Sequence, residues 1–199
     1  MRPKTLLEMA GVTPAPAPLS DSTVVVIDAQ REYVDGKLPL AGVTEALAEI
    51  GRLLARARAA RAPVIHILHQ GRAGGIFGPD TTGFEVAAPA SPAPGEAVVS
   101  KTLPNAFAST DLASRLAALK KPHVLLVGFM THLCVEATAR ASIDLGFKAT
   151  VVASATATRD LPDPLSGATV TAAEVQRNAL TAIADRFATI AATVDSLPD

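Results

Sequence analysis

One stretch decides the fold of this chain: Gly128-Phe129-Met130-Thr131-His132-Leu133-Cys134-Val135-Glu136-Ala137-Thr138-Ala139-Arg140. An apolar run at 124–127 precedes it and predicts a buried strand, and an apolar periodic segment reaching Leu145 follows it and predicts a helix. The only cysteine, Cys134, would then stand where a helix begins. Because a helix N-terminus carries unpaired N–H groups and partial positive charge, we expect a lowered pKa for this thiol. Position alone also fits a small buried hydrophobe, the usual role of a lone cysteine.

Composition limits the class of protein. The 199 residues fit one domain, and a hydrophobic fraction of 49% excludes a disordered chain. A net charge of -1 provides no electrostatic footprint for nucleic acid or a membrane surface. No apolar run approaches transmembrane length, no signal-peptide pattern is present, and one cysteine cannot form an internal disulfide. We therefore expect a cytoplasmic protein that binds neither nucleic acid nor membrane.

Strand and helix patterns alternate from residue 23 onward. Apolar runs predict six strands, at 23–27, 64–69, 97–100, 123–127, 150–153 and 187–194. Helical spacing predicts helices at 43–61, around 112–119, from Cys134 toward Gly146, and at 171–186, with an irregular loop at 156–170. The arginines of the first helix, Arg52, Arg56, Arg58 and Arg61, are expected on a solvated face. Alternation of this kind predicts an α/β fold with an open, mostly parallel six-stranded sheet and helices on both faces.

Residues 1–22 stand apart from this pattern. A Pro-Ala-Pro-Ala-Pro run at 14–18 is extended, and a short helical turn precedes it. We expect an N-terminal arm at 1–22, which either lies on the domain or on a partner subunit or is disordered. The domain itself is expected to span 23–199.

Three chemically distinctive side chains follow different predicted strands. Asp28 follows the first, Lys101 ends the third and Cys134 follows the fourth. With a doubly wound strand order of 3-2-1-4-5-6, all three lie at the carboxyl edge, near the switch point of the sheet. Asp28 is then the candidate base for the thiol proton, a protonated Lys101 favours the thiolate, and Cys134 attacks a carbonyl carbon. The backbone N–H groups of Cys134 and Met130 are candidates for an oxyanion hole.

The connection at 70–96 is rich in glycine and proline and predicts no secondary structure. Its apolar side chains, Ile76, Phe77 and Phe84, suggest a lid over a pocket, with simple packing as the alternative. Pocket-lining aromatic candidates are Tyr33, Phe77, Phe84 and Phe107, with core packing as the alternative for each phenylalanine. Polar substrate-binding candidates are Gln30, Asn105, Thr131 and His132, of which His132 fits a surface role equally well.

The same residues carry a family resemblance. The segment from Gly128 to Arg140 resembles the nucleophile motif of isochorismatase-like cysteine hydrolases, Asp28-Ala29-Gln30 resembles their first motif, and Lys101 with 105–107 resembles their lysine motif. The similarity runs from about 23 to 194 in family order. It implies an Asp-Lys-Cys triad at Asp28, Lys101 and Cys134 and a non-proline cis peptide between Phe129 and Met130. It also implies a homo-oligomer, dimer or tetramer, with the N-terminal arm as an interface element.

The chain departs from the nicotinamidases of this group, which resemble one another in an Asp-x-His pair that binds a metal. Here the second strand ends His69-Gln70-Gly71-Arg72. His66 and His69 are an odd number of positions apart, so a regular strand directs them to opposite faces. We therefore expect neither a metal site nor another cofactor.

The leading hypothesis is a metal-independent cysteine hydrolase that cleaves a C–N bond of a small-molecule amide, lactam or ureido substrate. An enzymatic alternative is vinyl-ether hydrolysis of an isochorismate-type substrate, which needs Asp28 as an acid but no thiol attack. A non-enzymatic alternative is a binding or sensing protein with a reactive low-pKa Cys134. A noncatalytic scaffold is least favoured, because three site-type residues would then share one sheet edge by coincidence.

Overall fold

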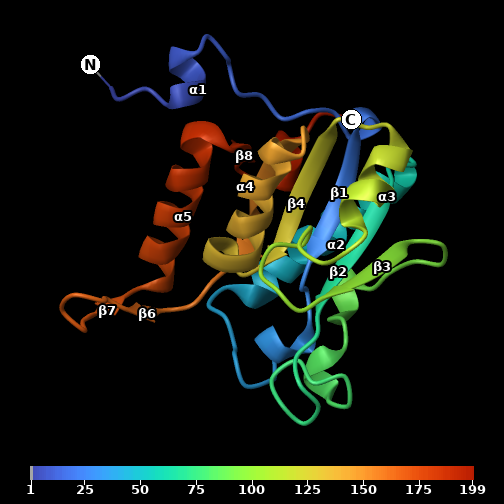
Figure 1. Ribbon diagram of the computed structural model, residues 1–199, viewed down its shortest axis with the longest axis vertical. Coiled ribbons are helices and arrows are strands. Elements are labelled where there is room, and N and C mark those ends of the chain that lie inside the picture. The colour runs from blue at the N-terminus through green and yellow to red at the C-terminus, as the bar shows by residue number, and fades with distance from the viewer. Residues whose placement is uncertain (1) are drawn as a thin grey trace.

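A computed structural model describes residues 2–199 and shows a six-stranded parallel sheet between two layers of helices (Figure 1). The strands of this sheet are β1 (Ser22–Ile27), β2 (Val64–His69), β3 (Ala97–Lys101), β4 (His123–Phe129), β5 (Lys148–Ala157) and β8 (Ala188–Ala191). Their order is β3-β2-β1-β4-β5-β8, and every neighbouring pair is parallel. The predicted α/β fold and its strand order are confirmed, with β8 as the sixth strand.

The helices divide between the two faces of the sheet. One face packs against α2 (Val43–Ala59), and the other packs against α3 (Leu112–Leu119), α4 (Glu136–Asp144) and α5 (Ala172–Arg186). All six residues of β1 are buried, as expected for the β-branched run at the centre of a parallel sheet. The buried strand β1 therefore holds Asp28, the residue that directly follows it, in a fixed position.

Two connections are more regular than their sequences predict. Within residues 70–96, 3-10 turns form at Thr82–Phe84 and Ala88–Ala90. In the expected irregular loop, β5 continues to Ala157 and a short antiparallel hairpin joins β6 (Leu161–Pro162) to β7 (Thr169–Val170). A turn in which Asp163 accepts two backbone N–H groups stabilises that hairpin. These side-chain-to-backbone bonds leave no periodic signal, so pattern analysis misses them.

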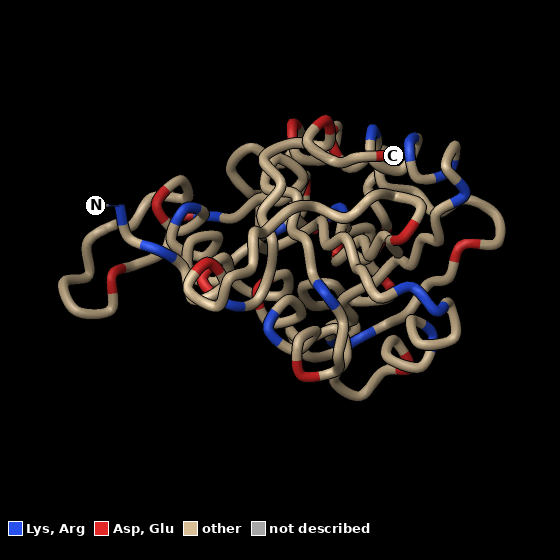
Figure 2. The backbone as a smooth tube through the Cα atoms, turned by 90° about the horizontal axis from the view of Figure 1, so that it is seen from above, with Lys and Arg blue, Asp and Glu red and all other residues tan. Residues whose placement is uncertain are grey.

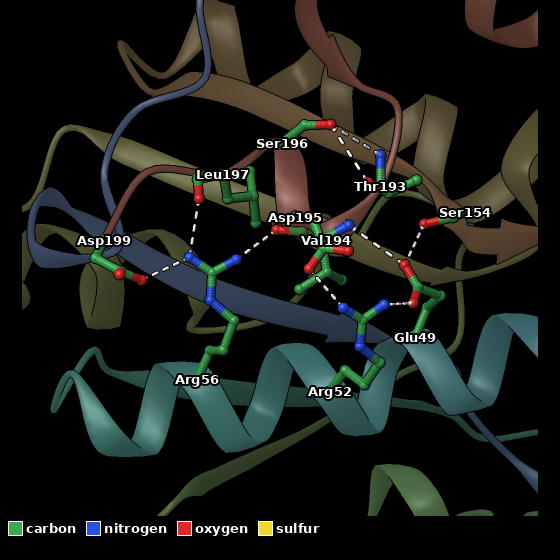
Figure 3. Close-up of polar contacts among 10 residues, drawn as sticks. All are labelled: Glu49, Arg52, Arg56, Ser154, Thr193, Val194, Asp195, Ser196, Leu197 and Asp199. Carbon is green, nitrogen blue, oxygen red and sulfur yellow. Dashed lines mark hydrogen bonds and ion pairs between the residues drawn. The ribbon is translucent and has the colours of Figure 1, made fainter.

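The arginines expected on a solvated face of α2 are partly exposed, but three of them have specific partners. Arg56 donates to the carbonyl oxygens of Val194 (2.5 Å) and Leu197 (2.9 Å) (Figure 3). Arg52 and Arg58 each pair with a carboxylate outside the helix. The expected solvated face is confirmed, since Arg52, Arg58 and Arg61 are exposed and Arg56 is half-buried, and the ion pairs lie on that face. The three paired arginines attach the C-terminal segment and the end of the 70–96 loop to α2.

The N-terminal arm packs on its own domain. Its helix α1 (Leu6–Met9) lies beside α5 (Figure 1), and the Leu6 N–H donates to Asp185 Oδ1 at 2.8 Å. Toward the end of the arm, Leu19 is fully buried in the core and bonds to the Pro198 carbonyl at 3.1 Å. Met1, at the start of the expected arm, lies outside the described residues.

Charges of both signs are distributed along the whole chain. Figure 2 shows Lys and Arg interspersed with Asp and Glu over the backbone. Within residues 2–199, none of the helices combines the length and the apolarity that a membrane span requires.

The contact between β1 and β4 depends on Gly128. Its φ is +110°, a region that favours glycine, and a Cβ there would lie 1.9 Å from the Ile27 carbonyl oxygen. Ile27 is its register partner in β1 and directly precedes Asp28. No side chain fits at this position unless the two central strands move apart.

We predict that Gly128→Ala lowers the free energy of unfolding by about 3 kcal/mol or more, because it adds a backbone clash to an unfavourable φ. Gly146→Ala is the matched control: Gly146 also has a positive φ, of +81°, but open space around it. The control should lose only about 1 kcal/mol. Urea unfolding of both variants measures the difference, and equal losses would show that the close strand contact is unimportant.

Candidate active site

Three side chains from separate parts of the chain meet at the carboxyl edge of the sheet. Asp28 follows β1, Lys101 ends β3 and reaches past β2, and Cys134 lies in the turn after β4. Lys101 Nζ lies 2.7 Å from Asp28 Oδ2 and 3.3 Å from Cys134 Sγ. All three residues are at most 3% exposed. The strand order thus brings together the three residues that sequence patterns selected.

The ammonium group of Lys101 is the only positive charge in this contact, and it does not offset the cost of burial. Burial raises the pKa of Asp28 to about 6, against the opposing effect of Lys101. Burial and the negative charge of Asp28 raise the pKa of Cys134 to about 12. The expectation of a lowered thiol pKa is therefore wrong. Near neutral pH Cys134 is therefore a protonated thiol, and Asp28 is the candidate base beside it.

The turn that holds Cys134 differs from the predicted helix start. The peptide bond between Phe129 and Met130 is cis, and residues Thr131–Val135 form a π-helical turn ahead of α4. The Met130 carbonyl oxygen accepts the N–H groups of Leu133 (3.1 Å) and Val135 (3.2 Å). Cys134 therefore lies inside a wide turn, held by its backbone, and the regular α-helix begins two residues later.

Two polar residues expected to contact substrate bind the protein backbone instead. The Gln30 amide donates to the carbonyl oxygens of His69 (3.0 Å) and Phe84 (2.9 Å) and accepts the His69 N–H (2.8 Å). Thr131 Oγ1 donates to the Ala157 carbonyl at 3.1 Å. Both side chains are fully buried. They fasten strand ends and the 70–96 loop around the site, and a role in direct substrate contact is not supported.

His132 lies beside the site. It is half-buried, its Nδ1 lies 2.5 Å from Thr158 Oγ1, and burial followed by the charge of Arg159 lowers its pKa. His132 is therefore held against the end of β5, at the mouth of the turn that carries Cys134.

Asn105 and Phe107 follow β3. Asn105 accepts the Phe107 N–H at 2.9 Å, which stabilises a local turn. The Phe107 ring stacks on Phe147, with centroids 6.0 Å apart. Phe147 bonds to Ser142 near the C-terminal end of α4, away from Cys134. Phe107 is partly buried against the core cluster that includes Cys134, so its role as a pocket residue stays a prediction.

One aromatic side chain of the 70–96 loop, Phe77, packs against residues beside the site. Phe77 is buried and makes edge contacts with Tyr33 and His69, with ring centroids 5.0 and 5.3 Å apart. Burial raises the pKa of Tyr33, and the negative charges of Asp28 and Cys134 add to this effect. Phe77 thus joins Tyr33 to His69, whose ring in turn lies 3.3 Å from Lys101 Nζ. The loop lies at this end of the sheet (Figure 1), and its role as a lid stays a prediction.

Two residues near the site were not assigned a role from the sequence. His69 Nδ1 lies 3.3 Å from Lys101 Nζ. Arg159 Nε is buried and lacks a hydrogen-bond partner in the part of the chain that the structure describes, and the positive charge of Arg159 opposes the pKa shift of Tyr33. His69 ends β2 and Arg159 follows β5, and these positions at the carboxyl edge are the signal that the sequence offered for them.

The histidines of β2 do not converge as metal ligands. His66 pairs with Glu96 at 2.9 Å, whereas His69 faces Lys101. Across residues 2–199, no group of three or more His, Cys, Asp or Glu side chains is placed to hold a metal ion.

Comparison with known proteins gives consistent results over nearly the whole chain. The family model for the isochorismatase domain matches residues 22–195. The chain is 39% identical to a secreted isochorismatase effector of Verticillium dahliae, over 94% of this chain and 96% of that protein. It is 36% identical to a streptothricin hydrolase of Streptomyces noursei, over 81% of this chain and 59% of that protein.

A solved structure is also closely similar. The crystal structure of an isochorismatase from Pseudomonas putida superposes with a TM-score of 0.93 at 38% identity, covering 98% of this chain and 100% of that one. The resemblance inferred from the sequence motifs is thereby confirmed. With an isochorismatase-domain match over 22–195 and relatives of this identity, the chain belongs to the isochorismatase family.

Proposed function

We propose that this protein is a metal-independent cysteine hydrolase that cleaves a C–N bond of a small amide, lactam or ureido substrate. The observation that carries the proposal is the contact of one buried ammonium, Lys101 Nζ, with both the Asp28 carboxylate and the Cys134 sulfur. A base, a cation and a nucleophile within one contact network are the parts that nucleophilic acyl transfer needs.

The first half of the proposed reaction forms an acyl-enzyme. Asp28 takes the thiol proton as Cys134 Sγ attacks the carbonyl carbon, and Lys101 stabilises the sulfur while negative charge develops on it. The substrate oxygen accepts the backbone N–H groups of Met130 and Cys134. When the C–N bond breaks, Asp28 returns the proton to the leaving nitrogen.

The second half releases the acid. Asp28 takes a proton from a water molecule as the water oxygen attacks the acyl carbon. The Cys134 sulfur then leaves the acyl carbon and recovers the proton from Asp28. The starting thiol and carboxylate are restored. A pKa near 6 for Asp28 suits both directions of proton transfer at neutral pH.

Relatives support hydrolysis as the reaction class. The streptothricin hydrolase of Streptomyces noursei is 36% identical to this chain. We also propose a cytoplasmic homo-oligomer, although the relative from Verticillium dahliae is named as secreted.

The raised pKa of Asp28 favours one second candidate, vinyl-ether hydrolysis of an isochorismate-type substrate. A carboxyl group with a pKa of about 6 holds enough proton near neutral pH to act as a general acid. The sensor alternative has less support, because a thiol pKa of about 12 leaves almost no reactive thiolate at neutral pH.

We predict that Cys134→Ala lowers amide turnover by about a thousandfold or more, because the covalent route is lost. Intact-protein mass spectrometry of the wild type after incubation with an amide library should show an acyl adduct on Cys134. Ser142→Ala, which removes a buried hydroxyl from α4, serves as a control for packing changes and should keep its activity. Amidase activity retained in purified, folded Cys134→Ala would refute the proposal.

We predict that kcat/KM for an amide rises about tenfold per pH unit below about pH 6 and then levels off, because Asp28 must be ionised to act as the base. The pKa of the Cys134 thiol, about 12, is too high to change the pH–rate profile near neutral pH. For vinyl-ether hydrolysis the expected pH dependence is opposite, because Asp28 must then be protonated. The rate of that reaction would fall above about pH 6. Initial rates from about pH 5 to about pH 9 separate the two reactions.

A further inference from the structure

The hydrogen bonds of Lys101 include a third acceptor besides the two central partners. An ammonium has three N–H donors. Lys101 Nζ lies 2.7 Å from Asp28 Oδ2, 3.3 Å from Cys134 Sγ and 3.3 Å from His69 Nδ1. His69 ends β2, which lies between β1 and β3, and it is the register partner of Lys101. The Lys101 side chain is completely buried, so a donor without an acceptor would be costly there.

The imidazole of His69 is suited to accept rather than donate at this atom. Burial and the charge of Lys101 lower the pKa of His69 to about 4, so the ring is neutral near pH 7. A neutral ring that accepts at Nδ1 carries its proton on Nε2. The ring therefore adds no second positive charge next to Lys101.

The backbone and the ring of His69 are both held in place. Gln30 bonds to its N–H and to its carbonyl oxygen, at 2.8 and 3.0 Å. Phe77 packs an edge against its ring, with centroids 5.3 Å apart. A side chain fixed from two sides can impose its own geometry on a flexible lysine.

We propose that His69 is a positioning residue that accepts the third hydrogen bond of Lys101 and thereby holds the ammonium between Asp28 and Cys134. This inference rests on the proposed function. During attack, the proton moves from the sulfur to Asp28, and the carboxylate loses its charge. The hydrogen bond that Lys101 donates to His69 does not change in that step, so it keeps Lys101 directed toward the sulfur as negative charge develops there.

Two nearly isosteric replacements separate hydrogen bonding from packing. His69→Leu removes the acceptor, whereas His69→Asn places an amide oxygen near the former Nδ1 position. The readout is the rate of Cys134 alkylation by iodoacetamide, followed by intact-protein mass. We expect the rate to fall about tenfold in the Leu variant and to stay within about threefold of wild type in the Asn variant. Equal rates in the Leu variant and the wild type, or equal losses in both variants, would overturn the proposal.

His66→Leu is the matched control for a buried histidine on the same strand. His66 is 1% exposed and bonds to Glu96, with no contact to Lys101 among the described residues. This variant should lose stability in urea unfolding while its Cys134 alkylation rate stays at the wild-type value. A tenfold slower alkylation in His66→Leu would mean that general loosening explains the effect, against the proposal.

A spectroscopic test needs no substitution at His69. In a long-range proton–nitrogen NMR spectrum at pH 7, the His69 ring should show a protonated Nε2 and an unprotonated Nδ1. A protonated Nδ1 would overturn the proposal.

Neither the alkylation rate nor the tautomer depends on a substrate, so both remain informative if amide hydrolysis is refuted. If an amide substrate is found, kcat of His69→Leu should fall about tenfold with KM within about twofold of wild type, since the ground-state contacts of the substrate are unchanged. A rise in KM alone would instead make His69 a substrate-binding residue and contradict the proposal.

Discussion

The structure depends on one buried ammonium that is shared by three strands. Lys101 extends from the end of β3 past β2 to contact Asp28 after β1 and Cys134 after β4. A positive charge with no exposed surface is tolerable only when acceptors surround it, and removing one partner of such a group costs far more than the pair contributes. Lys101 can therefore be buried only because the strand order brings its partners Asp28 and Cys134 to the same edge of the sheet.

The fold and the three central residues were predictable because they follow from periodicity and strand order. The β-branched run at 23–27 and the apolar run before Gly128 indicated central parallel strands, and a doubly wound order places the residues that follow them at one edge. The roles of Gln30 and Arg56 were not predictable. Each binds backbone carbonyl groups that are distant in sequence, and no local pattern reports such partners. His69 was missed for the same reason, since its partner Lys101 lies on another strand.

The sequence placed Cys134 correctly after the fourth strand, but the low thiol pKa expected from that position was wrong. A charge at a helix N-terminus gains about 0.3–1 kcal/mol, which corresponds to less than about one pKa unit. Full burial shifts a pKa by about 3–5 units in the opposite direction for a thiol. With Cys134 only 3% exposed, burial dominates, and the pKa rises to about 12. The sequence indicates which strand end carries the cysteine, but the depth of that residue depends on side chains distant in sequence, such as Ile27 and Leu126, that share its core cluster.

A buried, protonated thiol has a consequence for selectivity. A cysteine that is a thiolate at rest reacts with any electrophile or oxidant that reaches it. In the proposed reaction the sulfur becomes nucleophilic only while Asp28 accepts its proton and Lys101 stabilises the new charge, and both of these groups are buried. In the proposed reaction, a resting thiol of this kind therefore owes its reactivity to Asp28 and Lys101 rather than to a low pKa of its own.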